Sequence, residues 1–142
     1  MARDESCVFC KITSGQLPCT RVAESLHAFC FMDINPIAVG HALVVPRQHY
    51  ETVMEMPLEE AADMFRLAVR VGPALREVVA AEGLNILQNN GRCAGQVVGH
   101  VHVHLIPRRT GDGLRWPWPA TKADPKELAR LAEKVISQLE GL

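Results

Sequence analysis

The sequence has no excess of charge of either sign and no long run of apolar residues. Its 142 residues include 15 lysines and arginines against 16 aspartates and glutamates, for a formal net charge of −1. Proteins that attach non-specifically to nucleic acids carry a basic field, which this composition does not supply. No stretch approaches the roughly 20 apolar residues that cross a bilayer, and Arg3, Asp4 and Glu5 precede no apolar export segment. We therefore expect a cytoplasmic protein with neither a nucleic-acid nor a membrane partner.

The sequence also lacks a disulfide framework. Its five cysteines are odd in number and accompany no export signal, which favours reduced thiols. Cys7 and Cys10 are separated by two residues, and this spacing lets two thiolates bind one metal ion from a tight turn. His49 and one histidine of the group described next would complete a Cys2His2 zinc site. Two buried thiols without a metal are the alternative.

Three histidines alternate with two valines between residues 100 and 104. Successive side chains of a strand point to opposite faces, so His100, His102 and His104 would share one face at steps of roughly 6.5 to 7 Å. Val101 and Val103 would share the other face, which is marked for burial. Burying a polar ring without a partner costs a hydrogen bond. The row therefore predicts a site whose partners are a metal, a phosphate, a substrate or other side chains.

Short apolar runs bounded by turn residues predict the strands around this row. They indicate neighbouring strands at 29–32 and 42–45 and a further strand at 84–88. The histidine strand is predicted over 97–106, where Pro107 ends it, and it would form a hairpin with the strand before it.

Helical spacing predicts two helices. The main helix is expected from Leu58 to about Glu82, with a kink or a break at Gly72 and Pro73 because proline removes a backbone donor. A second helix is expected to begin at Asp124, whose side chain precedes a proline at the first helical position. One compact domain accommodates all of these elements, since 48% of the residues are hydrophobic.

Two polar features lie near the predicted strand ends. The loop 89–96 contains Gly91 and Gly95, which would let backbone amides approach a phosphate, although an ordinary hairpin loop explains it equally well. Asp33 follows a predicted strand, where it would either cap a turn or accept a ligand hydroxyl.

The run from His100 to Ile106 resembles the signature of the histidine triad (HIT) nucleotide-binding proteins. Other blocks resemble the family in the family's order: Cys-Val-Phe-Cys-Lys-Ile at 7–12, Asp-Ile-Asn-Pro at 33–36, the stretch 40–49, and Gly-Gln at 95–96. The resemblance covers roughly residues 7–110 and is with the bacterial, zinc-containing, Hint-like type.

The resemblance and the predicted elements together imply one HIT-like domain over 1–142. This α+β domain would contain an antiparallel sheet of about five strands with the main helix packed on it. Residues 114–142 would form a tail with paired Trp and Pro residues and the C-terminal helix, which differs from the short eukaryotic type. The family also implies a homodimer.

The resemblance implies a role for each matching residue. His102 would be the nucleophile that attacks the α-phosphorus of a purine nucleotide, without a catalytic metal. The other implied catalytic residues, which flank the phosphate, are His104 and His41. The implied nucleotide-binding residues are Asn89 and Gln96 at the phosphate, Asp33 at the ribose, and Phe9, Phe31 and Ile34 at the base. The implied ligands of a structural zinc are Cys7, Cys10, His49 and His100.

The activity implied by the resemblance is hydrolysis or transfer at the α-phosphate of nucleoside phosphoramidates or related nucleotides. It would proceed through a nucleotidyl-histidine and release a nucleoside monophosphate. Residues 107–109 with Gly111 and Asp112 resemble instead the branch that hydrolyses dinucleoside polyphosphates. A hydrolase with three histidines on a catalytic zinc, and a nucleotide-binding adaptor with little turnover, are alternatives from other classes. Val97 stands where many members carry serine or threonine, so the leaving group does not follow from the family.

Overall fold

A five-stranded antiparallel sheet lies at the centre of the protein, with strand order β1-β2-β3-β5-β4. The computed structural model describes residues 4–115, 118 and 121–141. The strands are β1 (Arg21–Glu24), β2 (Ala28–Met32), β3 (Ala42–Pro46), β4 (Gly83–Gln88) and β5 (Val103–Arg108). The helices are α1 (Val8–Thr13), α2 (Leu58–Val78) and α3 (Pro125–Glu140), with short 3-10 helices η1 (Val53–Glu55) and η2 (Arg92–Ala94). The predicted α+β class and antiparallel sheet are confirmed.

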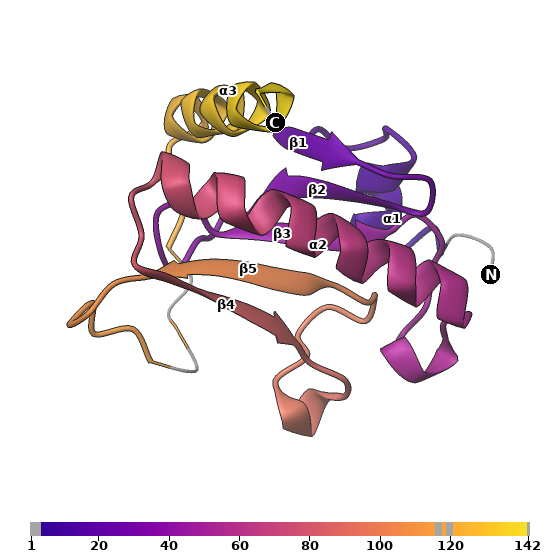
Figure 1. The fold of residues 1–142 in the computed structure, drawn as a ribbon. Helices are drawn as coiled ribbons and strands as arrows, with labels where there is room; N and C mark the ends of the chain where they lie inside the picture. Colours follow the sequence, from indigo (N-terminus) through magenta and orange to yellow (C-terminus); the bar gives the residue numbers. More distant parts are fainter. Residues whose placement is uncertain (1–3, 116–117, 119–120, 142) are drawn as a thin grey trace.

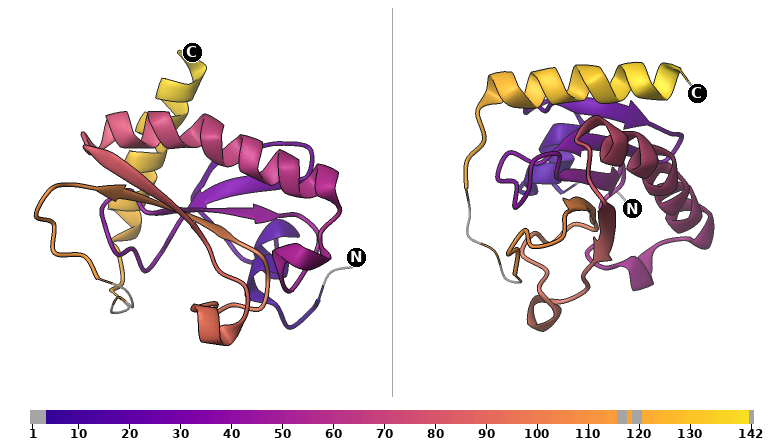
Figure 2. Two further views of the ribbon diagram at one scale, coloured as in Figure 1. Left: turned by 60° about the horizontal axis from the view of Figure 1, so that its bottom comes forward. Right: turned by 60° about the vertical axis from the view of Figure 1, so that its left-hand side comes forward.

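The sheet separates two apolar layers of different size. Helices α2 and α3 cover one face, where the main core lies, and α1 lies on the other (Figures 1 and 2). The buried side chains of the main core include Met32, Val44, Leu75, Val103 and Leu105. The smaller cluster beside α1 consists of Phe9, Phe29, Phe31, Leu43 and Val45. Val101 and Val103 belong to the main core, whereas the histidines that alternate with them do not and lie on the α1 side, as the alternation predicts.

Helix α2 runs from Leu58 to Val78 with no break at Gly72 and Pro73, one of the two outcomes expected there. Pro73 lies inside it with an exposed ring, while Ala74 and Leu75 directly after it are buried against the sheet. The packing of this face outweighs the one backbone donor that proline removes, because most helical stability in proteins comes from such packing. The predicted end at Glu82 is also wrong, since the chain turns at Ala80 with a φ of 55° before β4 begins.

The predicted neighbours at 29–32 and 42–45 are confirmed as β2 and β3, with Phe29 opposite Val45. Strand β1 and helix α1 were not expected. Both are short, with four and six residues, so neither shows a full period of apolar residues. Helix α1 begins where the Cys7 sulfur accepts the backbone N–H of Cys10 at 3.4 Å. A cysteine at this position is an unusual cap and gave no signal in the sequence.

The histidine strand is shorter and later than predicted. Strand β5 begins at Val103 and continues through Pro107 to Arg108, so His100 and His102 precede it. Before Val103 the chain has a different partner, because the Val101 N–H donates to the Tyr50 carbonyl at 2.9 Å. Strand β3 pairs with β5 only as far as Leu105, so no strand is paired with Pro107 on that side. The proline is tolerated there because its missing N–H breaks no hydrogen bond of the sheet. The predicted hairpin with the preceding strand is confirmed as β4 and β5.

The C-terminal helix begins as predicted. The Asp124 side chain accepts the Lys126 N–H at 3.0 Å, and Pro125 occupies the first turn. Of the tail segment 116–119, only Trp118 lies within the described residues. No helix in the described ranges is long and apolar enough to span a membrane. The cytoplasmic location stays a prediction.

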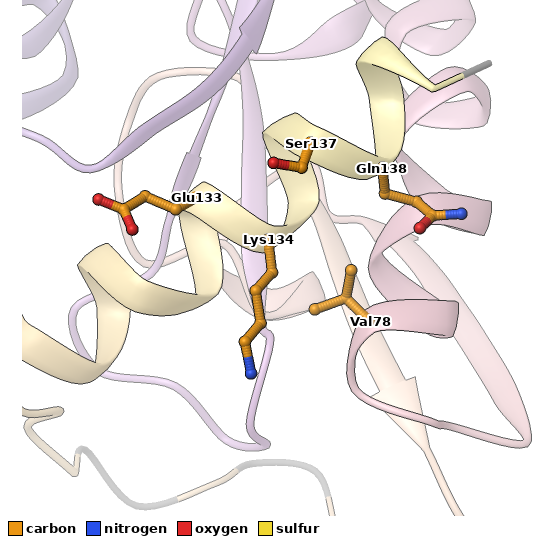
Figure 3. Close-up of a pocket in the computed structure, with 5 residues that line it drawn as sticks. All are labelled: Val78, Glu133, Lys134, Ser137 and Gln138. Atoms are coloured by element: carbon orange, nitrogen blue, oxygen red, sulfur yellow. The ribbon is translucent and has the colours of Figure 1, made fainter.

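A shallow hollow of about 500 Å³ lies where α3 passes the end of α2 (Figure 3). Its lining consists of Val78 from α2 and Glu133, Lys134, Ser137 and Gln138 from α3. Figure 3 shows the charged ends of Glu133 and Lys134 pointing in different directions. Without convergent polar groups this hollow has no features of a ligand site.

Candidate active site and metal cluster

The three histidines of the row are all buried but have different partners. His100 is fully buried, and His102 and His104 are 6% and 7% exposed. His100 lies in a cluster with two cysteines, whereas His104 lies in a separate cluster with His41 and Asp33. His102 stands between them. In the structure, His100 therefore belongs to a group that can hold a metal, His102 is a central ring, and His104 belongs to a pair with His41.

The first cluster brings together the residues expected to hold zinc: Cys7, Cys10, His49 and His100. Each offers one donor atom, and these atoms all lie within 4.8 Å of one another. The Cys7 sulfur is 3.3 Å from His100 Nδ1, and the Cys10 sulfur is 3.3 Å from His49 Nδ1. The two Nδ1 atoms are 3.2 Å apart. Helix α1 supplies the cysteine end of the cluster, and the chain after β3 supplies His49.

This donor set fits a tetrahedral zinc ion. Zinc bonds of about 2.3 Å to sulfur and 2.0 to 2.1 Å to nitrogen place neighbouring tetrahedral donors about 3.3 to 3.8 Å apart. His100 Nε2 is 3.0 Å from the Pro46 carbonyl and must donate to it, so the lone pair of His100 is on Nδ1 and faces the cysteines. Asp4 lies behind His49, with its carboxylate 4.0 Å from His49 Nε2. Burial raises the pKa of the Cys10 thiol, so an ion has to displace its proton.

His102 is held in one tautomer by the backbone. Its Nδ1 lies 2.8 Å from the His100 carbonyl, which can only accept a hydrogen bond. The proton is therefore on Nδ1, and Nε2 carries the lone pair. Burial lowers the pKa of His102, which keeps the ring neutral near pH 7. The edge-to-face contact with Phe9, at 5.2 Å between ring centroids, limits how the imidazole can turn. Its geometry is that of a nitrogen nucleophile.

His41 and His104 form a hydrogen-bonded relay. The Ile37 N–H donates to His41 Nδ1 at 3.1 Å, so the His41 proton is on Nε2. That nitrogen lies 2.9 Å from His104 Nδ1 and donates to it. His104 is then left with its own proton on Nε2. Burial lowers the pKa of His41 and lowers that of His104 to about 3, so both rings are neutral. His104 thus presents an N–H donor beside His102.

Asp33 has the first of the two roles that the sequence allowed, that of a turn cap, and it also contacts His41. Its Oδ1 accepts the Asn35 N–H at 2.8 Å and so caps the turn after β2. Its Oδ2 lies 3.4 Å from His41 Nε2, which directs one carboxylate oxygen into the site. Asp33 therefore contacts the relay as well as the turn.

The structure brings together two of the three residues expected at the base. Phe9 and Phe31 meet edge to face at 5.9 Å in the apolar cluster beside α1. Leu43 of the same cluster is directly opposite His104 on the neighbouring strand. Ile34 lies in the turn after β2 and is 58% exposed.

The loop 89–96 is organised by Gln96. Its amide nitrogen donates to the carbonyls of Glu51 and Val98 at 2.6 and 3.0 Å, and its oxygen accepts the Gly91 N–H at 2.7 Å. Both amide hydrogens are used, so Gln96 shapes the loop instead of offering a donor to a phosphate. Gly91 and Gly95 have φ values of 95° and 98°, which explains why glycine is needed at both positions. Asn89 lies at the start of the loop.

Several partners in the site were not expected. The Ile37 N–H and the Pro46 carbonyl set two histidine tautomers, but every residue type has these backbone groups, so no sequence signal marks them. Trp118 lies edge-on to His41 and His104, at 5.4 and 5.3 Å between ring centroids. The only signal for it was the Trp and Pro content of the tail. Val97, which follows Gln96 in the chain, is 90% exposed.

The comparisons with known proteins agree with this arrangement. The HIT domain family model matches residues 14–111. An adenosine 5'-monophosphoramidase of Schizosaccharomyces pombe is 40% identical over 95% of this chain and 99% of that protein. An adenylylsulfatase of Arabidopsis thaliana is 36% identical over 92% of this chain and 66% of that protein.

A solved structure provides the matching fold. It is that of a Zn-bound histidine triad family protein from Mycobacterium smegmatis, which is 36% identical with a TM-score of 0.84. The match covers 96% of this chain and 94% of that one. The chain therefore belongs to the HIT domain family.

Proposed function

We propose that this protein is a hydrolase and nucleotidyltransferase that cleaves nucleoside phosphoramidates at the α-phosphate, with His102 as the nucleophile. The observation that carries the proposal is the 2.8 Å hydrogen bond from His102 Nδ1 to the His100 carbonyl. It leaves the lone pair of Nε2 available on a neutral ring. The adenosine 5'-monophosphoramidase of S. pombe, 40% identical to this chain, supports the choice of substrate.

In the first step, His102 Nε2 forms a bond to the α-phosphorus while the bond from phosphorus to the leaving nitrogen breaks. The amine leaves with a proton from water, since the Val97 side chain has no hydroxyl to relay one. The ring becomes positively charged, and the His100 carbonyl stabilises it by accepting the Nδ1 proton in a hydrogen bond. The N–H of His104 donates to a phosphate oxygen as charge develops there.

In the second step, water attacks the phosphorus and the bond to His102 Nε2 breaks. The products are the nucleoside monophosphate, neutral His102 and one proton released to solvent. The bound nucleotide would be a purine nucleotide with its base against Phe9 and Phe31. Its ribose would lie near Asp33, and its phosphate near Asn89 and the loop that Gln96 holds.

The contacts of individual residues argue against two of the alternative functions, the hydrolase with three histidines on a catalytic zinc and the dinucleoside polyphosphate hydrolase. In the described part of the chain, the three triad histidines do not converge on one point, as a catalytic three-histidine zinc requires. The 2.9 Å separation of His41 Nε2 and His104 Nδ1 is explained by one hydrogen bond. Arg108 is bound to Asp112, and Arg109 donates to the Val79 carbonyl. Both arginines of the segment that resembles dinucleoside polyphosphate hydrolases therefore bind other parts of this protein.

We further propose that the Cys7 cluster holds a structural zinc. The ion would be bound by Cys7, Cys10, His49 and His100, and it would cross-link α1 to the chain before β5. It would also fix the His100 peptide, whose carbonyl orients the nucleophile. The ion would take no part in the reaction itself.

A homodimer is also proposed. Strand β4 forms one edge of the sheet, and its Ile86 is 41% exposed. Phe65 and Val69 stand one turn apart on the outer side of α2 and are 53% and 52% exposed. An edge strand and an apolar helix stripe of this kind are typical of a surface that a second copy covers.

Replacing Val69 with glutamate is expected to convert the dimer to a monomer, because it buries a charge in the proposed interface. Sedimentation velocity at micromolar concentration measures the change. Met54→Glu, at an exposed apolar residue outside α2, serves as the control and should stay dimeric. A wild-type protein that sediments as a monomer contradicts the proposal.

Replacing His102 with alanine is expected to reduce the hydrolysis of adenosine 5'-monophosphoramidate by at least about a thousandfold, because it removes the group proposed to form the covalent intermediate. Release of AMP measures the rate, and mass spectrometry after acid quenching should find nucleotide bound to His102 in the wild type. His27→Ala is the matched control, since His27 lies in neither cluster, and should stay within about twofold. Turnover by wild-type enzyme that never carries nucleotide on His102 would exclude this mechanism.

Replacing Cys10 with alanine is expected to remove the zinc, of which the wild type should hold one per chain, and to lower the melting temperature. Metal binding to the native state adds its free energy to folding, and this variant would lose that contribution. Elemental analysis and calorimetry measure both effects. Cys93→Ala, at an exposed cysteine in η2, should change neither. Full zinc content in Cys10→Ala would show that the metal lies elsewhere.

A further inference from the structure

One row of side chains crosses four strands of the sheet on the α1 side. The strand pairing places Arg21 of β1 opposite Phe31 of β2. Phe31 is in turn opposite Leu43 of β3, and Leu43 is opposite His104 of β5. Side chains that are paired on neighbouring strands share a face of the sheet. The row therefore leads from the edge strand β1, which is opposite the edge formed by β4, to the histidines (Figure 1).

The order of this row matches the order of the parts of a nucleotide. His104 is expected at the phosphate, whereas Phe31 and Leu43 belong to the apolar cluster beside α1, where the base is expected. Neighbouring strands lie about 4.8 Å apart, so three steps separate the backbones of His104 and Arg21 by about 14 Å. An extended nucleoside monophosphate and one arginine side chain together fill such a span. Arg21 would therefore meet the edge of the base that points away from the phosphate.

A bulge in β1 places Arg21 and Glu24 on the same face of the sheet. The register shifts between Arg21 and Ala23, and Glu24 is then opposite Phe29. Residues three apart in a regular strand point to opposite faces, and the extra residue of a bulge reverses this. Arg21 Cζ lies 5.0 Å from the centre of the Phe29 ring, which belongs to the same apolar cluster. The guanidinium thus lies directly beside the cluster in which the base is expected.

The charge of Arg21 is only partly balanced. Its Nη1 lies 3.2 Å from Glu24 Oε2, and Arg47 Nη2 lies 3.0 Å from the same oxygen. Arg47 is held further by two hydrogen bonds to the Ser25 carbonyl, at 2.9 and 3.3 Å. Arg21 has no second ion pair within the described ranges, and its side chain is 46% exposed. A guanidinium has five N–H donors, so Arg21 can still donate to a ligand.

We propose that Arg21 recognises the base and favours 6-oxopurines, such as guanine and hypoxanthine, over adenine. The proposal rests on the proposed function and names the substrates of the same site more closely. Arginine donates to the two acceptors O6 and N7 of guanine. Adenine has an amino donor in place of O6 and would turn it toward the guanidinium. Adenosine compounds would remain weaker substrates, because the apolar cluster and the histidines do not depend on this contact.

The experiment compares the 5'-monophosphoramidates of guanosine, inosine and adenosine, which share one leaving group and differ only in the base. The wild type should show a kcat/KM at least about threefold higher for guanosine and inosine than for adenosine. Arg21→Met should lower kcat/KM for the first two by about threefold to tenfold, mainly by raising KM, because the contact is remote from the reacting phosphorus. The adenosine compound should stay within about twofold. Inosine lacks the 2-amino group of guanosine, so a shared effect assigns the contact to O6 and N7.

Two further variants control for charge and for stability. Arg21→Lys should keep most of the preference, since lysine also donates to O6 and N7. Arg130→Met is the matched control, because Arg130 pairs with Glu127 three residues away, as Arg21 does with Glu24, but lies on α3. It should leave kcat/KM within about twofold for all three substrates.

Equilibrium binding of the products provides a readout that does not need turnover. GMP should bind to the wild type more tightly than AMP and should lose this advantage in Arg21→Met. If the wild type treats the three bases alike, or if Arg21→Met affects all three equally, Arg21 does not recognise the base, and nucleotide trapped on His102 would still support the proposed function. If the GMP preference depends on Arg21 but His102 never carries nucleotide, the proposed function fails and the base preference stands.

Discussion

The site depends on one hydrogen bond, from His102 Nδ1 to the backbone carbonyl of His100 at 2.8 Å. A carbonyl can only accept, so this contact decides which nitrogen of the central ring is free. The His100 peptide is itself held through its side chain, with Nε2 on the Pro46 carbonyl and Nδ1 among the cysteine and histidine donors. A zinc ion in that cluster would therefore act on the chemistry through the backbone, at a distance from the substrate.

Hydrogen-bond partners also determine which ring nitrogen carries the proton in the other histidines. Each ring has two nitrogens, and the partner of one determines what the other can do. The Ile37 amide makes His41 a donor to His104, and His104 in turn becomes a donor toward the expected phosphate. Burial keeps these rings neutral by lowering the pKa of His41 and His104. Histidines that are equivalent in sequence thus acquire a metal-binding, a nucleophilic and a hydrogen-bonding geometry.

The sequence could predict those features that depend on side-chain type and spacing. The alternation of histidine and valine predicted the two faces correctly, and the four zinc ligands implied by the family resemblance do lie together. Backbone partners such as the Pro46 carbonyl have no sequence signal, because every residue supplies them. Helix α2 continues through Pro73 because packing outweighs local propensity, which spacing alone does not measure. The contact of Trp118 with the histidines joins residues that are far apart in the sequence, so it is a long-range property of the fold.

The tautomer of His102 is the central claim, and it can be measured directly. Nitrogen-15 NMR of the zinc-loaded protein, labelled at histidine and recorded near pH 7, distinguishes a protonated from an unprotonated ring nitrogen at each residue. His27 provides an internal reference, because it lies in neither cluster. The account predicts that His102 is neutral, with its proton on Nδ1 and its lone pair on Nε2. A proton on Nε2, or a doubly protonated ring, would contradict it.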